Sequence, residues 1–171
     1  MHSQSKPDTS YLHALHWTDP SNFKLPSHGS DLENNFVQQI EDLFTNYTHE
    51  NINLNLPKLY ADKIYFRDAF RQFNSSKELL PYMLKGVNAV EKANFEFNKI
   101  IKADGEFFIE WTMSIQFKGK KDSDRSIGMS RFRFNSEGKV IFHQDYWDPT
   151  TIIYDKIPIA SQLIRLVQKL V

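Results

Sequence analysis

The chain has 171 residues, balances 21 Lys and Arg against 21 Asp and Glu, contains no cysteine, and is 14% aromatic. The length suits one domain that buries its own core, and the balanced charge disfavours general nucleic-acid binding. The absence of cysteine excludes disulfides, thiol catalysis and cysteine-ligated zinc. The 14 Phe, 7 Tyr and 3 Trp residues indicate either a core packed with rings or a cavity lined by them.

The N-terminal segment shows no targeting signal. Residues 1–29 are rich in Ser, His, Pro and Asp and have no hydrophobic period, so we expect an irregular arm. They lack the basic segment and apolar run of a secretory signal. No part of the chain approaches the run of about 18 apolar residues that a membrane span requires. We therefore expect a cytoplasmic protein.

The first clear element beyond the arm is a long amphipathic helix. Ser30 and Glu33 form a capping box, and apolar residues recur behind them at helical spacing as far as Tyr47. Pro57 suits the first turn of a helix, so we expect a short second helix over residues 57–61.

A strand and a third helix are expected next. Residues 63–69 suit a strand, and Ser75 with Glu78 repeats the capping-box pattern ahead of a helical stripe that ends at Val87. Pro81 falls inside this stripe, where its missing N–H disfavours a helix, so a later start of the helix stays open.

After residue 92 the hydrophobic period changes to two, which predicts strands. The clearest spans residues 107–117, with one face almost wholly apolar and the other mostly polar. Asp104-Gly105 indicates a hairpin turn before it, and further strands are predicted over 126–134 and 139–147. Helices followed by long antiparallel strands indicate an α+β fold with helices on one face of a curved sheet.

Pro158 opens a predicted C-terminal helix with one apolar stripe. This helix packs either on the domain body or on a partner subunit, and we disfavour the alternative of reversible membrane contact. The predicted organisation is therefore an irregular arm (1–29), a single domain (30–150) and a C-terminal helical extension (151–171).

Three stretches make part of this pattern recognisable: LYADKIYFRDAF, FRFNSEGKV and IFHQDYWD. Together they resemble the NTF2-like superfamily, SnoaL-like branch, whose relatives include ketosteroid isomerase, limonene-epoxide hydrolase and polyketide cyclases. The resemblance covers residues 31–150. It implies a cone in which N-terminal helices pack in the concave face of a curved antiparallel sheet, a deep apolar pocket, and a homodimer formed through the sheet.

The resemblance to ketosteroid isomerase implies a general base at Asp68, in the motif FRDA. The two oxyanion donors of that enzyme type align with Phe44 and Ser130, so both strong donors are missing. Without such donors a dienolate would be poorly stabilised, and we therefore disfavour steroid isomerisation.

The resemblance to the epoxide hydrolases and cyclases points to the last strand. Asp145 matches the aspartate of the hydrolase motif, but the required Arg-x-Asp pair is replaced by WTM at 111–113, which disfavours that mechanism. The cyclase type uses an acid/base Asp and a His, and Asp145 with His143 is similar to that pair. The two lie two residues apart and share one face of a regular strand.

The candidate catalytic residues are therefore Asp145, Asp68 and His143. A carboxylate facing an apolar pocket gains basicity through desolvation; the alternative is that each aspartate caps a turn or pairs with an arginine at the pocket rim. For His143 and Asp145, a purely structural hydrogen bond is the competing interpretation. The candidate ligand-binding residues are Trp111, Met113, Phe44, Phe66, Phe97, Ser130 and Trp147.

Two functions stay open on the amino-acid sequence alone. The first is binding of a small, largely apolar molecule in an aromatic-lined pocket, and the second is acid/base catalysis of an isomerase, cyclase or hydratase type. The missing donors favour binding, while the pair of aspartates favours catalysis. We expect no metal, no cofactor and no nucleic-acid partner. The strand phase also places Arg131 and Arg133 on the outer face, toward solvent or a partner subunit.

Overall fold

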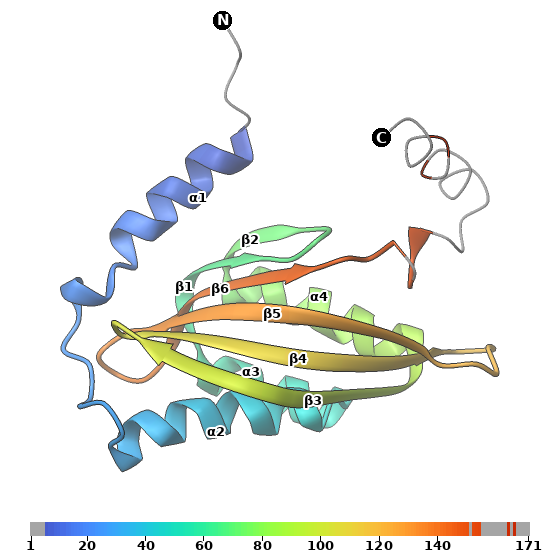
Figure 1. The fold of residues 1–171 in the computed structure, drawn as a ribbon, viewed down its shortest axis with the longest axis horizontal. Helices are drawn as coiled ribbons and strands as arrows, with labels where there is room; N and C mark the ends of the chain where they lie inside the picture. Colours follow the sequence, from blue (N-terminus) through green and yellow to red (C-terminus); the bar gives the residue numbers. More distant parts are fainter. Residues whose placement is uncertain (1–5, 151, 155–163, 165, 167–171) are drawn as a thin grey trace, which may run out of the picture.

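The structure is a computed structural model and describes residues 6–150, 152–154, 164 and 166. Figure 1 shows its helices around one sheet. In chain order the described elements are α1 (Lys6–Trp17), the short 3-10 helix η1 (Pro20–Asn22), α2 (Asp31–Thr45), α3 (His49–Leu59), β1 (Tyr60–Arg67), β2 (Gln72–Ser75), α4 (Ser76–Ala89), β3 (Val90–Ala103), β4 (Glu106–Phe117), β5 (Asp124–Phe134) and β6 (Val140–Trp147).

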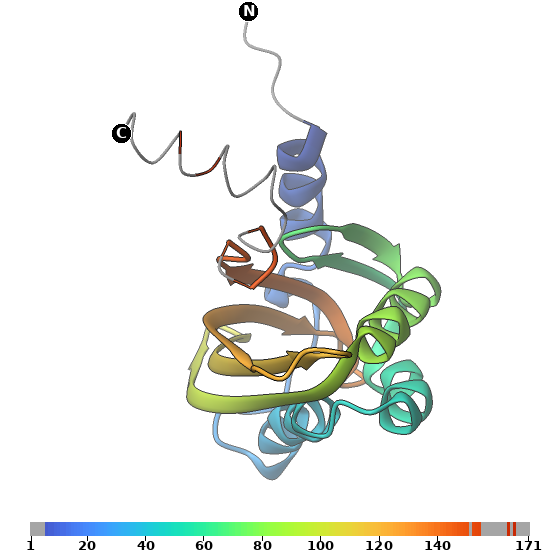
Figure 2. The same ribbon diagram turned by 90° about the vertical axis from the view of Figure 1, so that its right-hand side faces the viewer.

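The strands form one curved sheet in the order β2-β1-β6-β5-β4-β3. Neighbouring strands run antiparallel except β1 and β6, which are parallel, so the sheet is mixed rather than wholly antiparallel as expected. Helices α2, α3 and α4 lie together on the inner face (Figure 2). The predicted α+β cone is confirmed.

The inner face of the sheet and the apolar stripes of the helices make the main core. Alternate residues of β4, among them Phe107, Ile109 and Met113, are buried against the helices, as the period-two pattern predicts. Asp104 and Gly105 both have positive φ, 51° and 76°, in the predicted turn between β3 and β4. A two-residue turn of this kind matches the twist of the flanking strands.

Helix starts follow the sequence signals in two cases and differ in one. The Ser30 hydroxyl accepts from the Glu33 N–H at the start of α2, and the Ser75 hydroxyl caps α4. Helix α3 begins at His49, not at Pro57, because Thr48 accepts from the Asn51 N–H and caps it there.

The segment predicted to be irregular contains α1, which lies on the outer face of the sheet. Ala14 packs against Tyr65 of β1 and Phe142 of β6, and all three side chains are at most 1% exposed. Helices therefore cover both faces of the sheet, not one. The apolar residues Tyr11, Leu15 and Trp17 indicated that this segment packs on the domain body, but its partners come from strands distant in sequence, so no local pattern identified them.

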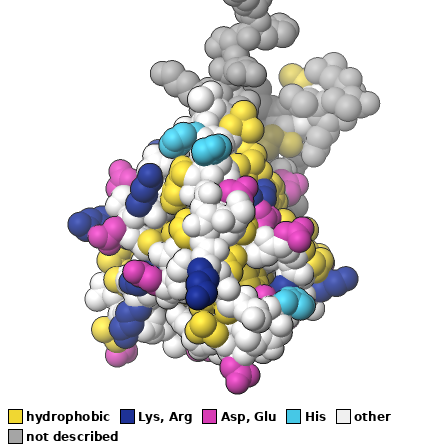
Figure 3. All heavy atoms as spheres, turned by 90° about the vertical axis from the view of Figure 1, so that its left-hand side faces the viewer, with side chains coloured by type: hydrophobic (Ala, Val, Ile, Leu, Met, Phe, Trp, Pro, Cys, Tyr) yellow, Lys and Arg dark blue, Asp and Glu magenta, His cyan; other side chains and the backbone are white. Residues whose placement is uncertain are grey.

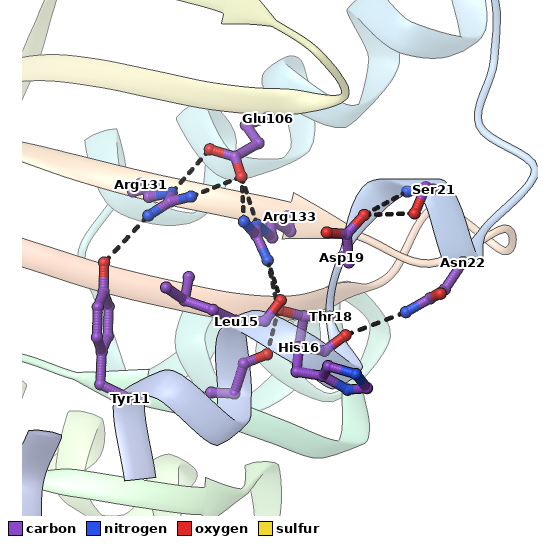
Figure 4. Close-up of polar contacts among 11 residues, drawn as sticks. Tyr11, Leu15, His16, Thr18, Asp19, Ser21, Asn22, Glu106, Arg131 and Arg133 are labelled. Atoms are coloured by element: carbon purple, nitrogen blue, oxygen red, sulfur yellow. Dashed lines mark hydrogen bonds and ion pairs between the residues drawn. The ribbon is translucent and has the colours of Figure 1, made fainter. Parts of the chain in front are cut away.

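The outer-face arginines bind this helix rather than solvent. Arg133 donates to the backbone oxygen of Leu15 at 2.9 Å, and Arg131 donates to the Tyr11 hydroxyl at 3.1 Å. Glu106 of β4 accepts from both guanidiniums (Figure 4). Arg133 thus satisfies a free carbonyl near the C-terminus of α1, where the helix dipole favours a cation.

The remaining features concern the chain ends and the surface. Ile152 is buried in the main core, whereas the helix predicted from Pro158 lies almost wholly outside the described residues. No helix among the described residues is both long and apolar enough to cross a membrane. Figure 3 shows acidic and basic side chains interspersed over the end of the molecule near α1, in keeping with the zero net charge.

Candidate functional site

A small niche opens on the inner face of the sheet, between β3–β6 and α2. Its volume is about 30 Å³, comparable to the space that one water molecule takes in the liquid. We call it the inner-face niche. Its lining residues are Phe44, Phe95, Phe97, Ile109, Trp111, Ser130, Phe132, His143 and Asp145.

A chain of hydrogen bonds runs along the niche and converges on Asp145. The His143 Nε2 lies 2.7 Å from Asp145 Oδ1, and the Ser130 hydroxyl donates to the same oxygen. The Trp111 indole N–H donates to the Ser130 hydroxyl oxygen at 2.8 Å. At the other end, the Tyr60 hydroxyl lies 2.7 Å from His143 Nδ1.

The directions of these hydrogen bonds follow from the chemistry of the groups. An ionised carboxylate only accepts, so the Nε2–H of His143 donates to Asp145. Among the described residues the Tyr60 hydroxyl has no other acceptor, so it donates to Nδ1, which therefore carries no proton. The network therefore holds His143 as the Nε2–H tautomer.

The second oxygen of Asp145 has a different environment. No hydrogen bond from the described residues reaches Oδ2, and no buried side-chain N or O atom among them lacks a partner, so Oδ2 must be accessible. Oδ1 is held by two donors, whereas Oδ2 has no hydrogen bond from the described residues. Ser130 cannot act as a nucleophile activated by His143, because its hydroxyl is bound to Asp145 instead.

Aromatic rings enclose the imidazole of His143, whose exposed fraction is 1%. Phe132 stacks on it with centroids 4.1 Å apart. Phe66 and Phe44 meet it edge to face at 4.9 and 5.9 Å. This packing fixes the ring plane, so both imidazole nitrogens point along the hydrogen-bond chain.

Gly128 on β5 allows the Trp111 indole to reach Ser130. A Cβ at this position would lie 2.3 Å from Trp111 Cη2 and 2.4 Å from Cζ2. These distances are far inside ordinary contact, so any side chain at residue 128 would displace the indole. Gly128 is therefore part of the site, although it offers no functional group.

Asp68 has a structural role at the turn after β1. Its Oδ1 accepts from the backbone N–H groups of Phe70 and Arg71 at 2.8 and 2.7 Å. Its Oδ2 accepts from the Tyr82 hydroxyl. Asp68 thus matches the turn-capping alternative, and it is absent from the niche lining.

Burial and the charges of the nearby aspartates raise the pKa of three tyrosines, of which Tyr60 is buried and Tyr47 and Tyr82 are partly buried. Burial first, and then the charges of Asp145 and Asp68, raise the pKa of Tyr47 far above its ordinary value. Burial also raises the pKa of Tyr82, as does its hydrogen bond to Asp68. For Tyr60, burial followed by the charge of Asp145 raises the pKa. All three hydroxyls therefore stay protonated and serve as donors.

The other sequence candidates divide into two groups. Six of them line the niche: Phe44, Phe97, Trp111, Ser130, His143 and Asp145. Met113, Phe66 and Trp147 belong to the surrounding core instead. Phe66 still contacts His143, and Trp147 packs on Phe70 with centroids 5.7 Å apart.

Sequence reasoning missed five contributors. Phe95, Ile109 and Phe132 line the niche and share the strand phase of residues that were named, so their periodicity already carried the signal. Tyr60 carried no such signal, because its contact with His143 spans 83 positions of the chain. Gly128 in the predicted strand was the remaining sign, since glycine inside a strand often marks close approach of another group.

A larger cleft on the surface contains a carboxylate whose partners are already in place. The cleft between residues 20–28, the start of α2 and the β3–β4 turn measures about 690 Å³. Its buried carboxylate, Glu33, already accepts from Lys102 at 3.1 Å and from the Gly29 N–H at 2.8 Å. Among the described residues, no group of three His, Asp or Glu side chains is placed to hold a metal ion.

The comparisons with known sequences give one family. Residues 36–143 match the model of a family described as "Uncharacterized conserved protein (DUF2358)". No curated protein sequence matches the chain.

Solved structures share the fold at low sequence identity. An NTF2-like protein of unknown function from Exiguobacterium sp. 255-15 aligns with a TM-score of 0.58 and 14% identity, over 66% of this chain and 98% of that chain. A protein with a ketosteroid isomerase-like fold from Catenulispora acidiphila DSM 44928, solved with trimethylamine, aligns with a TM-score of 0.57 and 16% identity, over 65% of this chain and 85% of that chain. A SnoaL-like protein from Jannaschia sp. CCS1 aligns with a TM-score of 0.62 and 8% identity, over 75% of this chain and 95% of that chain. The fold is therefore NTF2-like.

Proposed function

This chain belongs to the DUF2358 family of conserved proteins, and we propose that its inner-face niche binds a small, largely apolar molecule that carries one hydrogen-bond donor. The observation that carries the proposal is the accessible Oδ2 of Asp145 in an aromatic surround. The donor of the ligand would bind Oδ2, and its apolar part would contact Phe44, Phe97 and Trp111.

The niche is too small for a ligand unless side chains around it move. Ligand pockets usually measure about 300–1,000 Å³, whereas the niche measures about 30 Å³. A ligand larger than water must therefore displace side chains. Phe95 and Phe97 are the candidates, because both are only partly buried and lie on β3, an edge strand. Their displacement would open the niche without disturbing the Asp145 network.

The relative from Catenulispora acidiphila offers a comparison for the kind of molecule. Its structure holds trimethylamine, a compound with three methyl groups and, once protonated, a single N–H donor. That chemistry matches one accessible acceptor within apolar walls. The likeness supports a ligand of this type in the present chain.

Acid/base catalysis is the second candidate, favoured by the hydrogen bonds on Asp145. Oδ2 would take a proton from a carbon or water of the substrate and later return it to the product. The donors on Oδ1, His143 and Ser130, would hold the carboxylate in position. Binding without chemistry is favoured because no Arg, Lys or Tyr side chain among the described residues lines the niche to stabilise a developing oxyanion.

The proposed partner is a second copy of the chain, bound through the sheet. Helix α1 occupies part of the outer face, so the dimer would use what remains. Exposed apolar residues there are Ile127, Met129 and Tyr146, which are 66%, 40% and 46% exposed. Light scattering of the full chain tests this, with a dimer expected and a Met129→Lys variant expected to be monomeric. A cytoplasmic location is part of the same proposal.

Mass spectrometry of small molecules released on denaturing the freshly purified protein tests the binding function. We expect a near-stoichiometric molecule in the wild type and its loss in Asp145→Asn and Phe97→Ala. Phe108→Ala is the matched control, because Phe108 lies on the outer face of β4 and should leave the load unchanged.

Two results would decide the proposal. An empty wild-type protein, or equal loads in the niche variants and the control, would contradict binding in the niche. Incubating the released molecule with empty wild-type protein separates the two functions, since a changed mass or isomer would favour catalysis.

A further inference from the structure

The charge of the inner-face niche is not balanced by any basic side chain of the described residues. The lining includes the carboxylate of Asp145 and neither Lys nor Arg. Among the described ion pairs, Asp145 contacts only His143. The charge balance of the niche therefore depends on the protonation of that histidine.

The hydrogen bond from Tyr60 argues that His143 is neutral. The Tyr60 hydroxyl has no other hydrogen-bond acceptor among the described residues. If Nδ1 of His143 also carried a proton, that buried hydroxyl could not donate at all, and an unmade bond of this kind is costly. The neutral tautomer satisfies every group, so the niche retains a net negative charge.

The carboxylate of Asp145 gives the niche a field that distinguishes ligands by charge. A cation that enters the niche would be stabilised by this carboxylate, whereas a neutral molecule of the same shape would not.

The walls of the niche suit the same kind of ligand. Phe95 meets Trp111 at 6.0 Å and an interplanar angle of 70°, and it meets Phe44 at 6.0 Å and 63°. Phe95 therefore packs edge to face against both of these rings. Ring faces are electron-rich and attract cations, most strongly where water is excluded.

We propose that the ligand of the inner-face niche is a small alkylammonium cation with one N–H, bound at Asp145 Oδ2. This inference rests on the proposed binding function and narrows its ligand class. A secondary or primary ammonium would bring two or three N–H donors into an aromatic lining, in which Oδ2 of Asp145 is the carboxylate oxygen that has no hydrogen bond from the described residues. A tertiary ammonium matches one acceptor with one donor.

The test compares two probes of nearly equal shape. Trimethylammonium and tert-butanol each carry three methyl groups and one donor, but only the first is charged. Each is titrated into the full-length protein at neutral pH and followed by NMR at the Trp111 indole N–H and the Phe97 ring. We expect trimethylammonium to bind about tenfold more tightly or better, in line with a desolvated cation–π contact and a charge-assisted hydrogen bond.

Two variants test whether the preference for trimethylammonium depends on Asp145. Asp145→Asn should reduce the preference for trimethylammonium over tert-butanol to the part that the aromatic rings contribute. Glu110→Gln is the matched control, since it removes one carboxylate from the exposed outer face of β4 and should change neither affinity. The wild-type comparison alone remains decisive if Asp145→Asn does not fold.

The outcomes separate the two levels of the proposal. If tert-butanol binds as well as trimethylammonium or better, the cation inference is overturned and niche binding stands. If neither probe shifts the Trp111 and Phe97 signals, niche binding itself is contradicted. A preference for the cation that is as strong in Asp145→Asn as in the wild type would also overturn the inference.

Discussion

Gly128→Ala tests the architecture of the niche through a single methyl group. The added Cβ would lie 2.3 Å from Trp111 Cη2, so the indole must retreat by more than 1 Å to regain an ordinary contact of about 3.5 Å. A movement of that size breaks the 2.8 Å hydrogen bond from Trp111 to Ser130. It thereby removes one of the contacts that position Asp145.

The expected loss of stability has three contributions. Overpacking costs about 1–3 kcal/mol, and an indole N–H left buried without a partner costs about 1–3 kcal/mol. Replacing glycine by alanine in extended backbone restores about 0.4–1 kcal/mol by restricting the unfolded chain. We expect the free energy of unfolding to fall by about 2–4 kcal/mol, a large share of the roughly 5–15 kcal/mol of a typical domain.

A double-mutant cycle isolates the clash. The atoms closest to the added methyl belong to the outer ring of the indole, which phenylalanine lacks. Gly128→Ala should therefore be nearly neutral in a Trp111→Phe background, with a coupling energy of about 2 kcal/mol or more. Urea unfolding followed by far-UV circular dichroism measures all four proteins. Equal costs in both backgrounds, or a neutral effect in the wild type, would show that the indole does not clash with the added methyl.

Single contacts elsewhere in the fold give further predictions. Tyr60→Phe removes the donor to His143 Nδ1; urea unfolding should show a loss of about 1–3 kcal/mol, and ¹⁵N NMR should show His143 leaving its single tautomer. Asn51→Ala removes three hydrogen bonds to carbonyls near the end of α2, so thermal unfolding should show about 2 kcal/mol of destabilisation. A loss of stability no larger than that of an Asn-to-Ala change at an exposed position would contradict this role. Glu106 is subject to burial, which raises its pKa, yet hydrogen bonds and charges from two arginines lower that pKa below 4.5. Its stabilising effect should be present above pH 4.5 and be lost as pH falls through the lowered pKa; the acid-side fall in melting temperature should be weaker in Glu106→Gln.

Local patterns predicted most of the elements because their causes are local. Ser30 caps α2 through a backbone N–H three residues away, and the alternation of β4 places its apolar side chains on one face. Both signals lie within a few residues of the structure that they specify. The start of α3 was misplaced because Pro57 was taken as its first turn, whereas Thr48 caps the helix and Pro57 lies inside it.

Helix α1 shows where local reasoning failed. Tyr11, Ala14, Leu15 and Thr18 do follow helical spacing, but Leu12 beside them is exposed and weakens the pattern. What stabilises this helix is the outer face of the sheet, assembled from strands more than 50 residues away. Tyr11, Leu15 and Trp17 indicated contact with the domain body, but no feature of the first 29 residues identifies the surface that they contact.

The candidate site also contains residues that the sequence placed correctly and one that it did not. Asp145 and His143 were predicted from their spacing on one strand, and they do form a hydrogen-bonded pair. Asp68 was predicted from its motif, yet backbone N–H groups of its own turn hold its Oδ1. Motif position alone cannot distinguish a carboxylate that faces a pocket from one that caps a turn.

Binding in the niche is tested most sharply by a search for intermolecular NOEs between niche side chains and a bound probe. Trimethylammonium and tert-butanol are added in turn to the full-length protein. We expect NOEs from the methyl protons of at least the cation to the rings of Phe97 and Trp111, and their loss in Asp145→Asn but not in Glu110→Gln. NOEs that go only to surface residues, or none to these rings from either probe, would contradict niche binding.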